Sequence, residues 1–340
     1  MRTGCGLRTV VKILEVFSEK LLLALAIPSE HQDLPVKHED VTVLNMTIGA
    51  NFKGEDIENK ISEVTISAGS EPQYVISDNA HNLVRGILDS GYVHYADISH
   101  SMGVILKKVY EKQPDFVELT TLLGKKRLQY HLTNKAYLLP PNMRTIARFM
   151  NMSEWVIWGN SMLACYNKLP KEMQEAYAFI NDYESLLQEL MDAIRHIEHI
   201  CKNKGFSCKT SKECQSYIVA HVIGNAYPRQ AHLGLKMLEY FRKEEAQLTE
   251  DMNICISSDI IESTFGIYKS KKSPNKLYGI TPFALMIPLY PKVVNESVTK
   301  TFNFKERLVN VKLKDIDAWT TEHLSKNWVT ERTKTLKQVS

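Results

Sequence analysis

The chain has 340 residues, of which 44% are hydrophobic and 24% are charged. This composition is typical of a folded globular protein and excludes a largely disordered one. The formal net charge of +3 is too small to indicate nucleic-acid binding by itself, and six cysteines are too few for a disulfide framework. The longest apolar run, residues 21–27, is much shorter than the roughly 20 residues that span a bilayer. We therefore expect a cytoplasmic protein without a membrane span.

The N-terminal third alternates expected strands with expected helices. Residues 7–17 carry apolar side chains at helical spacing, so we expect one amphipathic helix there. Apolar or alternating runs predict strands at 20–27, 41–49, 73–77 and 93–100. Helical patterns follow at 54–69, 79–91 and 101–112. This order predicts an α/β domain with helices on the faces of a mixed sheet.

The pattern changes from about residue 117 to 250. Long amphipathic segments without a convincing strand dominate this region, which predicts a helical block. A further helix is expected at 257–272, and residues 291–340 are basic and partly helical in pattern.

Asp78 directly follows the expected strand 73–77 and precedes an expected helix. A charge at the end of a core strand is costly unless something positive needs it there. Two interpretations remain open. The carboxylate caps the helix, or it binds a metal ion, because hard cations prefer carboxylate oxygens that rigid elements hold in place.

Glu262 lies in the helix expected at 257–272, flanked by Ile260, Ile261 and Phe265. It occupies either a surface position of an amphipathic helix or a functional position. A strand-end Asp and a helical Glu, separated by a large helical block, are two of the three acids of a known catalytic arrangement that holds two Mg²⁺ ions at a phosphodiester.

The chain resembles the DDE transposases of bacterial insertion sequences in the segments YVISDNAHNL, ADISHSMGVILKKVY, AYLLPPNMRTIARFMNMSEWVIW and SSDIIESTFGIYKSKKS, the last followed by GIT. The similarity runs from about residue 20 to 290. It implies a ribonuclease-H-like fold, in which a mixed sheet with flanking helices is interrupted by a large all-α insertion. It also implies a DNA transposase that hydrolyses phosphodiester bonds and transfers strands with two Mg²⁺ or Mn²⁺ ions.

By this resemblance Asp78 is the second acid and Glu262 the third, and both are metal ligands. Asp97 and His100 match the (C/D)-x-x-H element that follows the second acid; the alternatives are a helix cap and a packed histidine. Candidate DNA contacts are Lys269, Lys271, Lys272, Arg144, Arg148, Trp155 and Trp158. For these the alternatives are solvated helix faces for the charged residues and core packing for the tryptophans.

The first acid of the family should lie on a strand before residues 20–27, but residues 11–19, VKILEVFSE, contain no Asp. We therefore expect an internal deletion that removed this strand and exposed a sheet edge. Such a copy should bind DNA weakly and cleave it poorly. The alternative is a non-catalytic DNA-binding or inhibitory derivative of a transposase.

The expected organisation has five parts. They are a remnant of a DNA-binding helix (1–17), the first part of the ribonuclease-H-like domain (18–116), a helical insertion (117–250), the final catalytic helix (251–290) and a basic tail (291–340). The expected partners are DNA, as element ends and target, and further copies of the chain in a homo-oligomer. The expected location is the bacterial cytoplasm, in association with the nucleoid.

Overall fold

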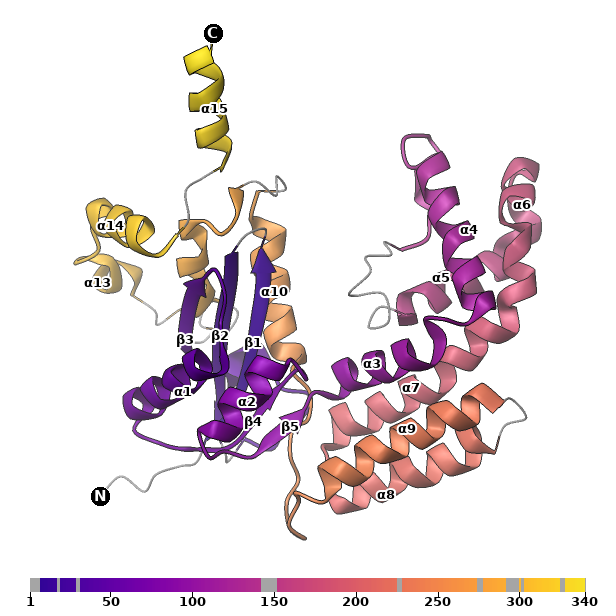
Figure 1. Ribbon diagram of the computed structural model, residues 1–340, viewed down its shortest axis with the longest axis horizontal. Coiled ribbons are helices and arrows are strands. Elements are labelled where there is room, and N and C mark those ends of the chain that lie inside the picture. Colours follow the sequence, from indigo (N-terminus) through magenta and orange to yellow (C-terminus); the bar gives the residue numbers. More distant parts are fainter. Residues whose placement is uncertain are drawn as a thin grey trace. The chain divides into compact units, whose positions relative to one another are not determined.

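The computed structural model describes residues 7–16, 19–28, 31–141, 152–224, 228–273, 278–291, 300, 303–324 and 328–339. The chain divides into two compact units, Met1–Asp97 together with Ile256–Ser340, and Ile98–Cys255 (Figure 1). The expected helical insertion 117–250 lies within the second unit. That unit begins earlier, at Ile98, because α3 (Ile98–Tyr110) packs against α7 (Glu184–Lys204) and α9 (Pro228–Glu245).

The first unit is built on a five-stranded mixed sheet with the order β3-β2-β1-β4-β5. Its strands are β1 (Leu7–Val16), β2 (Glu19–Pro28), β3 (Thr42–Gly49), β4 (Pro72–Ser77) and β5 (His94–Ala96). β1 pairs antiparallel with β2, and β2 with β3, whereas β4 runs parallel to both β1 and β5. The predicted α/β class, with a mixed sheet and flanking helices, is confirmed.

The helix expected at 7–17 is wrong, because residues 7–16 form the central strand β1. Val10 and Val11, with opposite orientations on the strand, are 0% and 2% exposed, so both faces of β1 are buried. A strand buried on both faces reads as a near-continuous apolar run, which fits helical spacing equally well. The expected deletion is contradicted too, since a strand does precede residues 20–27, and it fills the place between β2 and β4.

Helices cover the two faces of the sheet (Figure 1). On one face, α1 (Gly54–Ala68) and α2 (His81–Asp89) pack their apolar side chains against Val11, Leu22 and Val75 of the strands. On the other face, α10 (Asp259–Lys271) packs against β1. The described part of this unit also contains α13 (Phe304–Leu308), α14 (Leu313–His323) and α15 (Trp328–Val339), with 3-10 helices at His38–Asp40 and Pro282–Leu289.

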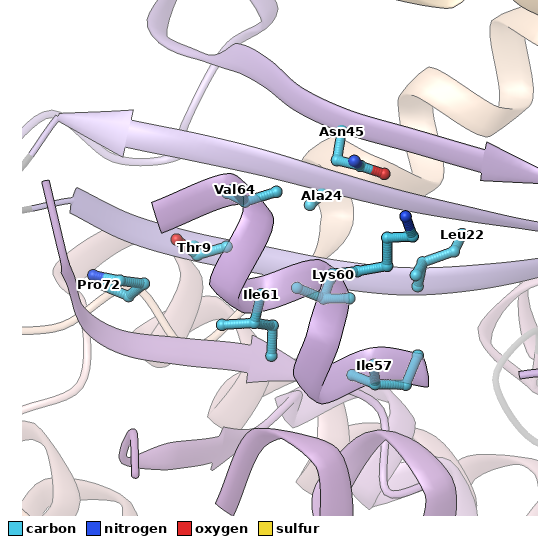
Figure 2. Close-up of a pocket in the computed structure, with 10 residues that line it drawn as sticks. Thr9, Leu22, Ala24, Asn45, Ile57, Lys60, Ile61, Val64 and Pro72 are labelled. Carbon is cyan, nitrogen blue, oxygen red and sulfur yellow. The ribbon is translucent and has the colours of Figure 1, made fainter. Parts of the chain in front are cut away.

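A small cavity lies between α1 and the sheet, where Ile57, Ile61 and Val64 face Leu22 and Ala24 (Figure 2). The cavity has a volume of about 10 Å³, which is at the lower limit for one water molecule. The buried hydroxyl of Thr9, which lines it, has no hydrogen-bond partner among the described residues. The surface that lines the cavity is apolar, and the cavity is too small for an organic ligand.

The second unit is helical. Besides α3, α7 and α9 it contains α4 (Pro114–Tyr130), α5 (Met152–Cys165), α6 (Lys171–Tyr177), α8 (Cys208–Tyr217) and a π-helical turn at Ile218–Ile223. α9 packs on this π-helical turn, and α5 on α7. Within the described parts of the chain, no helix is long and apolar enough to cross a membrane.

α1 and α2 approach each other closely at Gly86. A Cβ added there would lie 2.5 Å from the carbonyl oxygen of Gly54 and 2.6 Å from Cβ of Ile57. We expect Gly86→Ala to lower the free energy of unfolding by about 1–3 kcal/mol, because backbone and a buried side chain must move apart. Urea denaturation measures this loss.

The matched control is Gly266→Ala on α10, where an added Cβ meets nothing within 4 Å. This substitution should raise the free energy of unfolding by up to about 1 kcal/mol, because alanine is the better helix former. Equal effects of the two substitutions would contradict the close packing of α1 on α2.

Candidate functional site

Three carboxylates and one amine gather where the parallel strands of the first unit end. Asp78 follows β4, Asp97 follows β5, and Glu262 lies in the first turn of α10. Lys12 comes from β1, two residues beyond Val10, its last residue paired with β4. The carboxyl ends of parallel strands meet at one edge of a sheet, which brings these groups together although they lie far apart in the sequence.

The ammonium group of Lys12 forms an ion pair with Oε1 of Glu262. The Lys12 side chain is 9% exposed and that of Glu262 40%. The charges of Asp97 and Asp78 also act on Lys12. Since Val10 pairs with Ile76, the same register continued by two residues places Lys12 level with Asp78 on the same face of the sheet.

The protonation state of Lys12 follows from these neighbours. Burial lowers the pKa of Lys12, but Glu262, Asp97 and Asp78 together outweigh it and raise the pKa above the usual 10.5. Lys12 is therefore an ammonium ion at neutral pH. An ammonium ion has no lone pair, so Lys12 is not poised as a nucleophile or for Schiff-base chemistry. Its contribution to the site is positive charge.

Asp97 fixes the start of α10. It is 1% exposed, and its Oδ2 accepts hydrogen bonds from the backbone N–H of Ser258 at 2.6 Å and from the Ser258 hydroxyl at 2.9 Å. Ser258 is the N-cap residue of α10, and its carbonyl accepts from the N–H of Glu262. Asp97 thus helps to position Glu262. A capping role was one interpretation of Asp97, but the helix that it serves is α10, far along the chain.

Asp78 is half-buried, and its Oδ1 accepts a hydrogen bond from the backbone N–H of Ala80 at 3.0 Å. Ala80 is the N-cap residue of α2 and makes no side-chain cap of its own. Asp78 therefore supports the turn from β4 into α2. The capping interpretation and the functional one are compatible, because a carboxylate has a second oxygen.

Three of the other residues singled out from the sequence, His100, Trp155 and Trp158, belong to the second unit. His100 is half-buried on α3 in the second unit. Trp155 is 1% exposed, which leaves no ring face for a base, and Trp158 donates its ring N–H to the carbonyl of Leu138 and packs on Tyr177. Both tryptophans belong to the packing of the helical unit. Arg144 and Arg148 lie outside the described residues.

Three lysines end α10. Lys269 follows Glu262 by seven residues, so it lies two turns along the same helix face, about 10 Å away. Lys271 is also exposed but is turned to the opposite side of the helix. Lys272 is half-buried, and its pKa is lowered by burial and by the charge of Lys269. Lys269 is therefore the lysine that continues the carboxylate face of α10.

The implied Mg²⁺ does not fit this set of side chains as arranged. Mg²⁺ binds carboxylate oxygens at about 2.1 Å in near-octahedral geometry. Here the Lys12 ammonium is bonded to Glu262 and carries charge of the same sign as the ion. Among the described residues, no group of three or more His, Cys, Asp or Glu side chains is arranged to hold a metal ion.

Sequence reasoning missed Lys12 and the hydrogen bonds that join Ser258 to Asp97. A lysine inside the apolar run VVKIL was a usable signal, because a buried lysine needs carboxylates nearby. It was overlooked because the run was interpreted as a helix, on which Lys12 would face solvent. The sequence indicated Ser257 or Ser258 as the cap of this helix, and Ser258 is its N-cap residue. The bond of Ser258 to Asp97 carried no signal, since it joins residues 161 positions apart.

Neither the protein-family models nor the curated proteins contain a match to this chain. The function must therefore be argued from the site itself, together with the resemblance of its motifs.

We expect Asp97→Ala to lower the free energy of unfolding by about 1–3 kcal/mol, because it leaves the N–H of Ser258 buried without its acceptor. Ser258→Ala removes the hydroxyl bond and keeps the N–H bond, so its loss should be smaller, about 1 kcal/mol. Chemical denaturation of both variants tests the order. An Asp97→Ala protein as stable as the wild type would show that Asp97 does not anchor α10.

We expect the stabilisation that Lys12 provides to disappear at alkaline pH. Its folded pKa lies above 10.5, so its ion pair stabilises the fold below that pH and stops doing so as pH rises through the folded pKa. At about pH 8 we expect Lys12→Met to lower the free energy of unfolding by about 1–3 kcal/mol.

The difference in free energy of unfolding between Lys12→Met and the wild type should shrink above pH 10.5. Tyrosine ionisation is common to both proteins and cancels in the comparison. Urea denaturation at a series of pH values measures it, and a difference that stays constant through the alkaline range would contradict the assigned environment of Lys12.

Proposed function

We propose that the chain is a derivative of an insertion-sequence DDE transposase that keeps a ribonuclease-H-like core and binds DNA without cutting it. The observation that carries this is the meeting of Asp78, Glu262 and Lys12 at one edge of the sheet, beside the central strand β1. Asp78 and Glu262 are the acids that the resemblance assigns. Lys12 is a positively charged residue on the strand where the family has its first acid.

The sheet supports the ribonuclease-H-like assignment. Its order is β3-β2-β1-β4-β5, with an antiparallel half, β3 to β1, and a parallel half, β1 to β5. One acid follows β4, and another lies on α10, after the chain has passed through the helical unit. This is the succession that the resemblance implies: a first strand, an acid after the fourth, a helical insertion and a late acidic helix.

The side chains of β1 support the proposed absence of cleavage. Alternation along β1 turns Arg8, Val10, Lys12 and Leu14 toward the face on which α10 packs. The family places its first Asp on this strand, but none of these four side chains is acidic. Hydrolysis by two metal ions needs carboxylates that hold both ions between the attacking and leaving oxygens. A strand with a lysine there does not complete that set.

Lys269 supports DNA binding. Lysines neutralise phosphates and thereby release counterions, so they contribute affinity without sequence preference. Lys269 is exposed and lies on the same face of α10 as Glu262, which puts positive charge beside the edge where the carboxylates gather. A protein of this kind would occupy DNA without cutting it and so compete with an intact transposase for the same DNA.

Fluorescence anisotropy with a labelled DNA duplex tests the binding. We expect salt-dependent binding by the wild type. Lys269→Glu should weaken it and reduce the slope of log affinity against log salt by about 1. Lys271→Glu makes the same charge change on the opposite side of α10 and is the matched control, with a smaller effect.

A nicking assay on the same DNA with Mg²⁺ or Mn²⁺ tests the absence of cleavage. We expect no cutting by the wild type. Nicking that Asp78→Ala abolishes would identify an active transposase instead, and a wild type with no affinity for DNA at low salt would remove the proposed function altogether.

A further inference from the structure

Carboxylates gathered in one place repel one another and need positive charge among them. Asp78, Asp97 and Glu262 come from three different elements and all act on the same ammonium group. Asp97 and Lys12 are both buried, so solvent screens their charges little. A source of positive charge is therefore a structural requirement of this edge of the sheet.

Lys12 is built into that position. At Lys12, β1 is paired with β2, opposite Leu23, and its pairing with β4 ends two residues earlier, at Val10. The neighbours Val10 and Leu14 on the same face are 0% and 7% exposed, which confines the lysine stem between packed side chains. The ion pair with Glu262 then holds the ammonium group among the carboxylates.

We infer that Lys12 takes the place of a divalent cation, so that the wild-type chain binds no Mg²⁺ or Mn²⁺ at these carboxylates, and that removing the lysine charge turns the same carboxylates into a divalent-cation site. Hard cations and ammonium groups both neutralise carboxylate oxygens. The ammonium group of Lys12 is part of the chain, so it is always present at this place. Lys12 has this role whether or not the chain binds DNA.

The test is isothermal titration of Mn²⁺ into the full chain, with the melting temperature followed in parallel. The wild type should show no saturable site. Lys12→Met removes the charge, and Lys12→Asp replaces it with a fourth carboxylate. We expect both to bind one Mn²⁺ per chain, Lys12→Asp more tightly than Lys12→Met, and the ion to raise the melting temperature.

Two further variants locate the site. Lys20→Asp makes the same change on β2, where Lys20 contacts Glu15 and Asn51, and it should create no Mn²⁺ site. Adding Glu262→Gln to Lys12→Asp should remove the binding that was gained. Gained binding that survives Glu262→Gln lies elsewhere and would overturn the inference.

Folded Lys12 variants that bind Mn²⁺ no better than the wild type would also overturn it. If neither Lys12→Met nor Lys12→Asp folds, the Mn²⁺ titration of the wild type decides. A single Mn²⁺ site in the wild type that Glu262→Gln abolishes would show that the ion and Lys12 coexist, which contradicts the replacement. Absence of such a site supports it.

Discussion

The ion pair between Lys12 and Glu262 is the interaction on which the rest of the site depends. It joins the central strand of the sheet to the helix on its far face, and the charges of Asp78 and Asp97 bear on the same ammonium. An ion pair of this kind need not stabilise the fold much in total, because desolvation opposes the attraction. Removing one partner is costly nonetheless, since the others are left uncompensated. Lys12 is therefore both a structural element and the group that sets the chemistry of the site.

The remaining contacts explain why the charged groups meet where they do. Asp97, at the end of β5, holds Ser258 and so the first turn of α10, which carries Glu262. Asp78, at the end of β4, accepts from Ala80 and turns the chain into α2. Each acid that resembles a catalytic residue thus has a local structural task as well. A derivative that had lost catalysis would still keep these two aspartates, because the sheet and its helices depend on them.

Much of the fold was predictable from local pattern, but the centre of the sheet was not. Alternation and apolar runs predicted β2, β3 and β4, and amphipathic segments predicted the helical block, because these signals repeat over many residues. β1 was missed because burial on both faces erases the period that separates a strand from a helix. Asp78 and Glu262 were found through their motifs. Lys12 and the bond between Ser258 and Asp97 were not, since they depend on partners that only the folded chain brings near.

The central claim is that an ammonium group, and not a divalent ion, sits among these carboxylates in the native protein. The most direct measurement is a crystal structure of the wild-type chain grown with Mn²⁺, with anomalous scattering recorded to locate the metal. The account predicts that Nζ of Lys12 bonds to Glu262 and that no anomalous peak lies between Asp78 and Glu262. An Mn²⁺ ion coordinated by these two residues, with the Lys12 side chain turned away, would contradict it.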